Sequence, residues 1–336
     1  MCPAIPAARS YNQIHAPRKY SSGRRRVSIY LSWTYPGEAN RNPNELDNRY
    51  STMTEVRRVA WPKFESLAAD PLMFQAGIAG SLELFFRGWI PFQEVVEETT
   101  GHAVPIFQRV DHAGYKLPLD ERVLEDADTL LIFGLDHLVT QQEAAQAEID
   151  AVKEFLSREG TCLVLGPHHD VGASDDLEER EMEYRHHRDA LVPRQQRFGG
   201  YARSLMKGLG IPIENRYGLR PARDKETKQL APLTIMKDLD TRGYLAGVTT
   251  FSFHQHLPHY ALTTEDRNIH VLAWQPIDMR RPHPFTEAGN REFNTFVWLP
   301  PNGTRAGDVL VADSTIFSTL FGVDESLRQF WQNIVK

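Results

Sequence analysis

The chain has 336 residues, of which 41% are hydrophobic and 24% charged, and these globular values argue against a disordered, coiled-coil or fibrous protein. Its net charge of -6, with one dense basic stretch near the amino terminus, argues against a nucleic-acid-binding protein. Because no window approaches the roughly 18 apolar residues of a membrane helix, and two cysteines cannot form a disulfide framework, we expect a cytoplasmic protein without membrane partners.

The amino-terminal part of the chain contains an arm, a strand and a helix. Residues 1–26 are basic and contain several prolines, and we interpret them as a flexible arm. Residues 27–33 (VSIYLSW) predict the first strand, which a long polar loop follows. An apolar stripe over residues 77–89 predicts a helix that Pro91 restarts or kinks. Residues 103–110 predict a second strand.

The clearest pattern in the chain is a βαβ unit. Residues 128–134 (DTLLIFG) predict a buried strand, and residues 161–165 (TCLVL) predict another. Between them, Thr140 and Glu143 form a capping box in front of an amphipathic helix. A crossover of this kind is right-handed, so the two strands should be parallel neighbours in one sheet.

The carboxyl-terminal half gives weaker signals until its end. Residues 174–188 are rich in charge and predict a solvated helix or lid, and residues 198–209 predict an amphipathic helix. Asp324 is the expected N-cap of a last helix. Further strands are expected at residues 248–253, 269–274, 293–298 and 308–312. We expect the strand at residues 308–312 to share the parallel sheet with residues 27–33.

Two stretches resemble the glutamine-amidotransferase-like superfamily, and within it the ThuA-like and related domains. They are residues 126–170, DADTLLIFGLDHLVTQQE through AVKEFLSREGTCLVLGPHHD, and residues 307–321, GDVLVADSTIFSTLF. The resemblance implies an α/β fold with a flavodoxin-like open parallel sheet flanked by helices. It also implies a single domain over residues 27–336 with a long insertion between about residues 171 and 290.

The chain departs from that superfamily at the nucleophile. An amidotransferase presents a cysteine on a tight elbow after the strand, where Gly166-Pro167-His168 stands in this sequence. Cys162 lies within the preceding strand, where a small buried hydrophobic side chain is the expected role. Glutamine hydrolysis by a cysteine is therefore not expected, and the domain is interpreted as one that lacks the nucleophilic cysteine.

Polar residues follow the predicted parallel strands at their carboxyl ends, where open α/β sheets bind ligands. For any one of them a turn or cap role is the alternative, but their coincidence at one edge favours a site. We expect His169, Asp170 and Asp313 to be catalytic. We expect His137 and Ser314 to contact substrate.

Histidines also occur in a second segment. If residues 248–256 are extended, the two-residue period places His254 and His256 on one strand face, where they can share a metal ion with His168. Histidines bonded to backbone or water are an equally good interpretation. We interpret His187 differently: Glu183 lies one helical turn before it, which is typical of a solvated helix face.

The long loop after the first strand leaves the same edge of the sheet. Asn48 and Arg49 in this loop are candidate substrate-binding residues, and a simple covering loop is an equally good interpretation.

These residues together predict a metal-dependent hydrolase or lyase for a small polar molecule. A divalent metal, Zn or Fe, would be held by His168, His254 and His256, with His169 or Asp170 as general base. Two alternatives stay open: a non-catalytic ligand-binding or assembly module, and metal-free acid/base catalysis by His169 with Asp313. The substrate and the reaction type stay open as well, and a homo-oligomer is compatible with the sequence.

Overall fold

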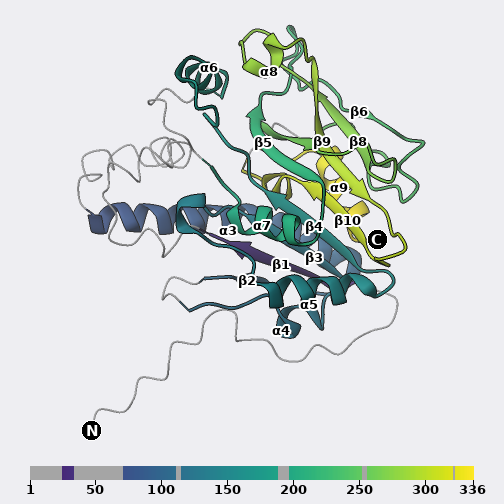
Figure 1. Ribbon diagram of the computed structural model, residues 1–336. Helices are drawn as coiled ribbons and strands as arrows, with labels where there is room; N and C mark the ends of the chain where they lie inside the picture. Colours follow the sequence, from purple (N-terminus) through teal and green to yellow (C-terminus); the bar gives the residue numbers. More distant parts are fainter. Residues whose placement is uncertain (1–24, 34–70, 111–114, 188–196, 252–255, 321) are drawn as a thin grey trace.

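The computed structural model describes residues 25–33, 71–110, 115–187, 197–251, 256–320 and 322–336. These residues form a mixed α/β structure with one large sheet and a smaller two-stranded sheet (Figure 1). The strands are β1 Val27–Ser32, β2 Ile106–Gln108, β3 Thr129–Gly134, β4 Cys162–Pro167, β5 Ile213–Leu219, β6 Thr234–Ile235, β7 Leu257–Leu262, β8 His270–Pro276, β9 Glu292–Leu299 and β10 Asp308–Ala312. The helices are α3 Pro71–Thr100, α4 Glu121–Leu124, α5 Gln146–Ser157, α6 Leu177–His187, α7 Gly200–Gly208, α8 Pro284–Glu287 and α9 Glu325–Ile334, with 3-10 turns η3 Leu138–Thr140 and η4 Ser314–Phe317.

The large sheet is parallel on one side and antiparallel on the other. Its eight strands among the described residues have the order β2-β1-β3-β4-β10-β9-β8-β6. The first five strands of that order are parallel, and β9, β8 and β6 are antiparallel to their neighbours. The predicted βαβ unit is confirmed, because β3 and β4 pair in parallel around α5. The expected membership of β1 and β10 in the same sheet is confirmed too.

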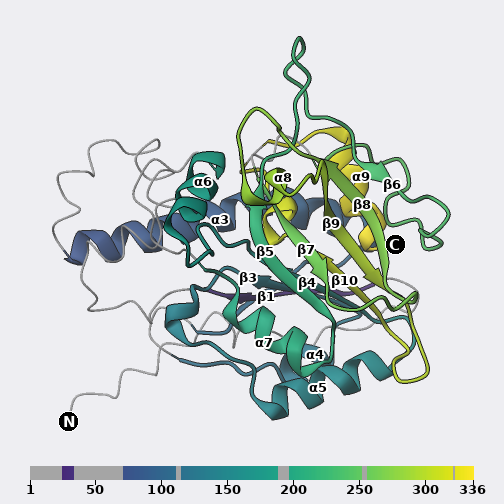
Figure 2. The same ribbon diagram turned by 45° about the horizontal axis from the view of Figure 1, so that its top comes forward.

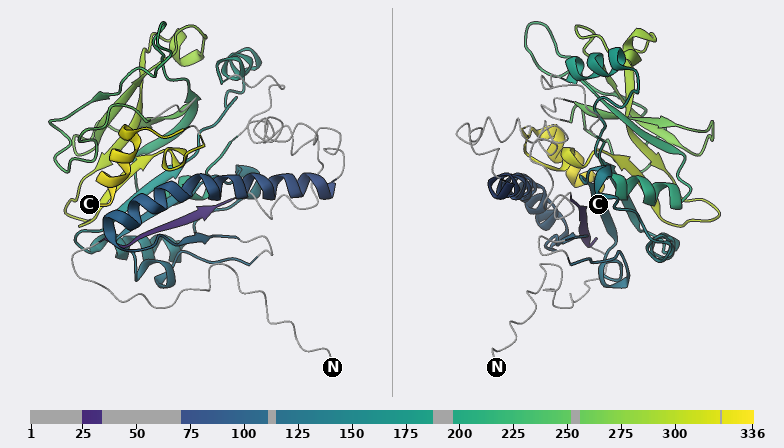
Figure 3. Two further views of the ribbon diagram at one scale, coloured as in Figure 1. Left: turned by 180° about the vertical axis from the view of Figure 1, so that it is seen from behind. Right: turned by 60° about the vertical axis from the view of Figure 1, so that its left-hand side comes forward.

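The parallel strands are buried on both faces, and their side chains alternate between two hydrophobic cores. On β3, Leu131 and Phe133 belong to one core and Leu130 and Ile132 to the other. Helices α3 and α9 cover the first face, as the view from behind shows (Figure 3). Helices α4, α5 and α7 supply the second core. The parallel part of the sheet is therefore held between two layers of helices.

The segment expected as an insertion contributes to both sheets. Strands β8 and β6 extend the large sheet, and β5 and β7 form the small antiparallel sheet. Helix α7 lies against β3 and β4, whereas α6 contacts β5 and α8 (Figure 2). This arrangement places α6 and the start of β7 beyond the carboxyl ends of the parallel strands.

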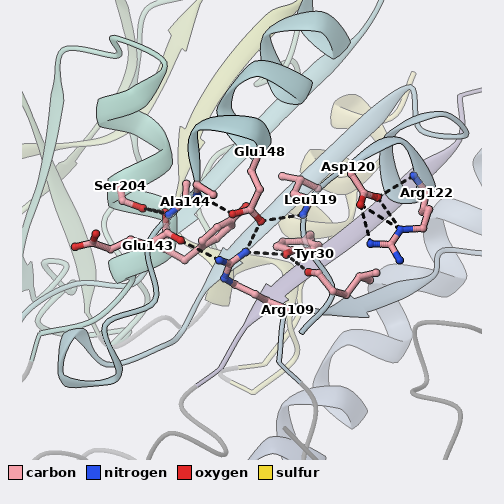
Figure 4. Close-up of polar contacts among 12 residues, drawn as sticks. Tyr30, Arg109, Leu119, Asp120, Arg122, Glu143, Ala144, Glu148 and Ser204 are labelled. Carbon is pink, nitrogen blue, oxygen red and sulfur yellow. Dashed lines mark hydrogen bonds and ion pairs between the residues drawn. The ribbon is translucent and has the colours of Figure 1, made fainter. Parts of the chain in front are cut away.

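A buried ion pair fixes the start of α5 (Figure 4). Glu148 binds the guanidinium of Arg109 and accepts hydrogen bonds from the Leu119 N–H at 2.9 Å and the Ala145 N–H at 2.8 Å. The Tyr201 hydroxyl donates to the same carboxylate at 3.2 Å, and the Arg109 guanidinium lies 4.0 Å above the Tyr201 ring. Glu148 thus joins the loop after β2, α5 and α7.

The two helices predicted from proline and capping signals begin and end elsewhere. Helix α3 continues through Pro91 without a break, so the predicted restart is wrong. The predicted capping box is wrong as well, because α5 begins at Gln146 and Glu148 caps it by accepting from Ala145. The Thr140 hydroxyl instead donates to the His137 carbonyl at 2.8 Å, which closes the short turn η3.

The strand predicted over residues 248–253 is wrong for the part that the structure describes. Residues 248–251 form no strand, and β7 begins at Leu257. The backbone N–H groups of Thr249 and Thr250 both donate to the Ser326 hydroxyl, at 2.8 and 2.9 Å, so they are satisfied without a strand ladder. Residues 252–255 lie outside the described residues.

The remaining expectations concern the termini, Cys162 and membranes. Asp324 caps α9 as predicted, its carboxylate accepting from the Leu327 N–H at 2.8 Å. Cys162 is buried in β4, and burial raises the pKa of its thiol to about 12. Most of the predicted flexible arm, residues 1–24, lies outside the described residues, while Arg26 binds Asp126. Among the described helices, none combines the length and apolar character needed to cross a bilayer.

Candidate functional site

Three turns bring polar side chains to the carboxyl edge of the parallel sheet. Asp136 and His137 follow β3, His168 to Asp170 follow β4, and Asp313 and Ser314 follow β10. Because β3, β4 and β10 are adjacent and parallel, their turns lie side by side. The named residues of all three turns are buried, so these groups are enclosed by the segments that pack over this edge.

His169, His187 and His256 form the histidine cluster. They come from the turn after β4, the end of α6 and the residue before β7, and each is at most 5% exposed. Their nitrogens lie within 4.8 Å of one another. Nε2 of His169 is 2.9 Å from Nε2 of His187, and the His256 ring centre is 3.8 Å from that of His187 and 4.5 Å from that of His169. Three segments distant in sequence therefore place three imidazoles around one point.

The chemistry of the cluster suits a transition-metal ion. Neutral imidazole nitrogens bind zinc and iron, and two such ligands at roughly 2.0–2.1 Å in a tetrahedral site are about 3.3 Å apart. The separation of 2.9 Å between His169 and His187 is close to this value and is also a hydrogen-bond distance. Burial, with the nearby His168 as a smaller cause, lowers the pKa of His187 well below its usual value, which favours the neutral, metal-binding form.

His168 and Asp313 form a second group beside the cluster. Nδ1 of His168 lies 3.3 Å from Oδ1 of Asp313, and these two residues with His169 also place their ligand atoms within 4.8 Å of one another. The Thr315 hydroxyl donates to the other oxygen of Asp313. The carboxylate therefore orients the His168 ring, whose centre is 4.0 Å from that of His169 and 6.5 Å from that of His256.

Asp170 binds two arginines and a backbone N–H, none of which belongs to the histidine cluster. Its oxygens accept from Nη2 of Arg203 at 2.6 Å and from the Phe198 N–H at 3.1 Å, and Arg197 lies 3.5 Å away. Burial raises the pKa of Asp170, and the charges of Arg203 and Arg197 oppose that increase. The candidate metal groups among the described residues do not include this carboxylate.

Strand β5 holds the turn that carries His168 and His169. The Asp170 N–H donates to the Arg216 carbonyl at 3.2 Å, and the Gly218 N–H donates to the Asp170 carbonyl at 3.0 Å. The Asn215 side chain donates to the His168 carbonyl at 2.6 Å. Gly218 lies so close to His169 that a Cβ there would be 2.3 Å from its ring. The register of β5 therefore positions His169.

Helix α6 places His187 in the cluster because hydrogen bonds hold the adjacent residue, His186, on both of its ring nitrogens. Nδ1 of His186 donates to the Arg281 carbonyl at 2.9 Å, and Nε2 accepts from the Arg220 N–H at 3.0 Å, which fixes the neutral tautomer. The interpretation of His187 as part of a solvated helix face is wrong, since this side chain is 5% exposed. The missed signal was that Glu183, Tyr184, His186 and His187 make one buried face.

Several predicted site residues lie elsewhere or outside the described residues. His254, Asn48 and Arg49 are in the latter group. Nε2 of His137 accepts from the Arg197 N–H at 3.4 Å, and its ring packs against Phe198, which separates it from His168. The hydroxyl of Ser314 is buried and has no hydrogen-bond partner among the described residues.

A cavity of about 950 Å³ lies beside the turn after β4, with Asp170 in its wall. Segments around α6, α7 and β5 line it, and its wall includes the Asp170–Arg203 ion pair and Asn215. The cluster histidines do not line this cavity. Its charged lining residues are Asp170, Glu179, Glu183, Glu214, Arg197, Arg203, Lys207 and Arg216.

Comparisons with known proteins give one structural likeness. No protein-family model and no curated protein matches the sequence. The structure is similar to the crystal structure of a ThuA-like protein from Bacteroides uniformis, with a TM-score of 0.36 and 9% sequence identity. The likeness covers 95% of this chain and 93% of that protein.

Proposed function

We propose that the chain is a metal-dependent hydrolase or lyase that acts on a small polar molecule at the carboxyl edge of its parallel sheet. The observation that supports this proposal is the convergence of His169, His187 and His256 within 4.8 Å in a buried position. Buried imidazoles are costly to group together unless they bind a metal or one another. A divalent ion, Zn or Fe, fits three imidazole ligands.

The neighbouring side chains support a proton-transfer role. A metal ion held by these three histidines would supply Lewis-acid activation of a water or of the substrate. His168, oriented by Asp313, lies next to the cluster and is the proposed proton carrier. The sequence predicted His168, His254 and His256 as metal ligands and His169 as catalytic, whereas the proposed ligands are His169, His187 and His256. The role of His254 stays a prediction.

We also propose that the parallel part of the large sheet has a flavodoxin-like core. The parallel strands have the order β2-β1-β3-β4-β10, which corresponds to the flavodoxin-like order 2-1-3-4-5 and supports a flavodoxin-like core. Membership of the glutamine-amidotransferase-like superfamily is proposed on the residues that resemble it. A small-molecule substrate is proposed from the polar turns at the carboxyl edge of the sheet, and a cytoplasmic location is proposed from the cysteine content of the sequence.

Elemental analysis tests the metal proposal directly. The untagged chain, purified and then treated with a chelator or reconstituted with Zn²⁺ or Fe²⁺, should contain about one metal ion per chain before chelation and after reconstitution. His187→Ala and His256→Ala should each lower metal affinity at least tenfold, because each removes one of three ligands. His270→Ala is the matched control, since His270 packs on Trp298 at the opposite edge of the sheet and should leave the metal content unchanged.

The contrary outcome favours a different function. If the wild-type chain binds neither ion stoichiometrically, the 2.9 Å contact between His169 and His187 is a hydrogen bond of a metal-free site. The chain would then be a non-catalytic module, or it would use acid/base chemistry by His169 with Asp313.

A further inference from the structure

We infer that Asp170 is a positioning residue, which acts with Arg203 to hold the backbone that presents His168 and His169. The sequence suggested Asp170 as a general base. The inference rests on the proposed function, because the position of His169 matters for holding a metal. Arg203 connects three segments: the turn after β4, the segment before α7 and strand β5.

Both oxygens of Asp170 contact groups that do not belong to the histidine cluster. Oδ1 accepts from Nη2 of Arg203 at 2.6 Å and from the Phe198 N–H at 3.1 Å, and Oδ2 lies 3.5 Å from Nε of Arg197. The side chain is 4% exposed, so water does not compete strongly for these contacts. A carboxylate that is bound in this way holds its own backbone in place and is poorly placed to take a proton from a substrate at the cluster.

Arg203 uses its three guanidinium nitrogens on three separate segments. Nε donates to the Phe198 carbonyl at 2.7 Å, Nη1 to the Asn215 carbonyl at 2.8 Å and Nη2 to Asp170 at 2.6 Å. The first contact lies before α7, the second on β5 and the third on the turn after β4. The planar fork of an arginine can make these bonds together, whereas a lysine cannot replace all three.

The contacts continue from Arg203 to the histidines. Asn215, whose carbonyl Arg203 holds, donates its side-chain amide to the His168 carbonyl at 2.6 Å. Three residues later on the same strand, Gly218 packs against the His169 ring. A shift of β5 would therefore move His169 relative to His187, and shifts of a few tenths of an ångström matter for metal–nitrogen bonds of roughly 2 Å.

Two measurements on four variants test the inference. Zinc affinity, by competition with a chelating dye, should decrease about 10- to 100-fold in Arg203→Met and in Asp170→Asn, the usual effect of losing a partner behind a metal ligand. Arg203→Lys should recover part of that affinity. Arg216→Met is the matched control, because Arg216 lines the same cavity but pairs with the exposed Glu214, and its affinity should stay within about twofold.

Imidazole nitrogen NMR of the metal-free protein supplies the second measurement. Arg203→Met, or Arg203→Lys if the first variant does not fold, should shift the ring resonances of His168 and His169, and Arg216→Met should leave them in place. Unchanged resonances in a folded Arg203 variant would overturn the inference. So would an Asp170→Asn variant with normal metal affinity but no activity, the behaviour of a general base. A wild-type chain that binds no zinc would refute the proposed function instead, while the NMR comparison would still decide the role of Asp170 and Arg203.

Discussion

The close approach of Gly218 to His169 leaves no room for a side chain. A Cβ at this position would lie 2.3 Å from Cδ2 and 2.7 Å from Nε2 of His169. Gly218→Ala should therefore displace the His169 ring, lower zinc affinity at least tenfold and reduce the free energy of unfolding by about 1–3 kcal/mol, the usual range for overpacking. A zinc titration and urea unfolding measure the two effects.

Gly303 provides the control for this substitution. A Cβ there would meet no atom within 4 Å, so Gly303→Ala should change stability by less than about 0.5 kcal/mol and leave zinc binding as it is. Equal zinc affinities in the two alanine variants would show that the backbone at residue 218 does not position His169.

Asp136 gives the stability of the protein a defined pH dependence. The Ser32 hydroxyl donates to this buried carboxylate at 2.6 Å and the Tyr201 N–H at 3.1 Å, and Arg109 acts on it electrostatically. Burial raises the pKa of Asp136 to about 6, above the value of about 3.9 in an unfolded chain. The folded state then binds the proton more tightly, so this group destabilises the fold progressively as the pH rises from about 4 to about 6.

Asp136→Asn should remove that pH dependence. The free energy of unfolding of the wild type, relative to that of the variant, should decrease by on the order of 2 kcal/mol between pH 4 and pH 6.5 and change little above. Urea unfolding of both proteins at several pH values gives this difference, and a difference that does not vary with pH would contradict the assignment.

Among single residues, the sequence predicted the polar turns well but missed His187. The residues after β3, β4 and β10 could be placed because a buried parallel strand fixes where its carboxyl end lies. His187 lies on a helix whose buried face is polar, with Glu183, Tyr184 and His186, so hydrophobic periodicity carried no signal for it. The polar side chains of a buried face find their partners on elements far away in the sequence, in this case β5 and α8.

At the scale of elements, α5 is tied to its neighbours by the carboxylate of Glu148. Glu148→Gln would leave the Arg109 guanidinium buried without its counter-charge, so we expect a loss of about 3–5 kcal/mol in the free energy of unfolding. Asp120→Asn removes an exposed ion pair with Arg122 in the same region and should cost less than about 1 kcal/mol. Chemical denaturation of both variants compares them, and equal losses would mean that Glu148 has no special role in holding α5.

The strands that the sequence predicted well are those whose own residues form a continuous apolar run. Continuous apolar runs flanked by turns predicted the ends of β3, β4 and β10 to within two residues. The segment at residues 248–251 has the same β-forming composition but no strand, because Ser326 on the distant α9 satisfies its backbone donors. A backbone hydrogen bond to a side chain far away in the sequence leaves no local sequence pattern.

At the scale of the molecule, the histidine cluster joins two parts of the structure. His169 comes from the turn after β4 in the large sheet. His187 ends α6 and His256 immediately precedes β7, and we call α6 with the small sheet β5-β7 the outer layer. A metal held by all three should stabilise the attachment of the outer layer through linkage to binding. We expect chelation to speed amide hydrogen exchange in α6, β5 and β7 and to leave β1, β3 and β4 unchanged.

The His187→Ala variant separates this effect from any general action of the chelator. Its hydrogen exchange should already resemble that of the chelated wild type and should not respond to added zinc. Equal acceleration across the large sheet and the outer layer would contradict a local attachment.

The position of β10 in the sheet has a consequence for how the chain folds during synthesis. β10 pairs with β4 on one side and with β9 on the other, yet residues 168–307 separate it from β4 in the sequence. Before β10 leaves the ribosome, the apolar edge of β4 has no partner, and β9, β8 and β6 have no attachment to the parallel strands. The nascent chain therefore carries an open strand edge while residues 168–307 are synthesised, a period in which such edges are prone to aggregate and to bind chaperones.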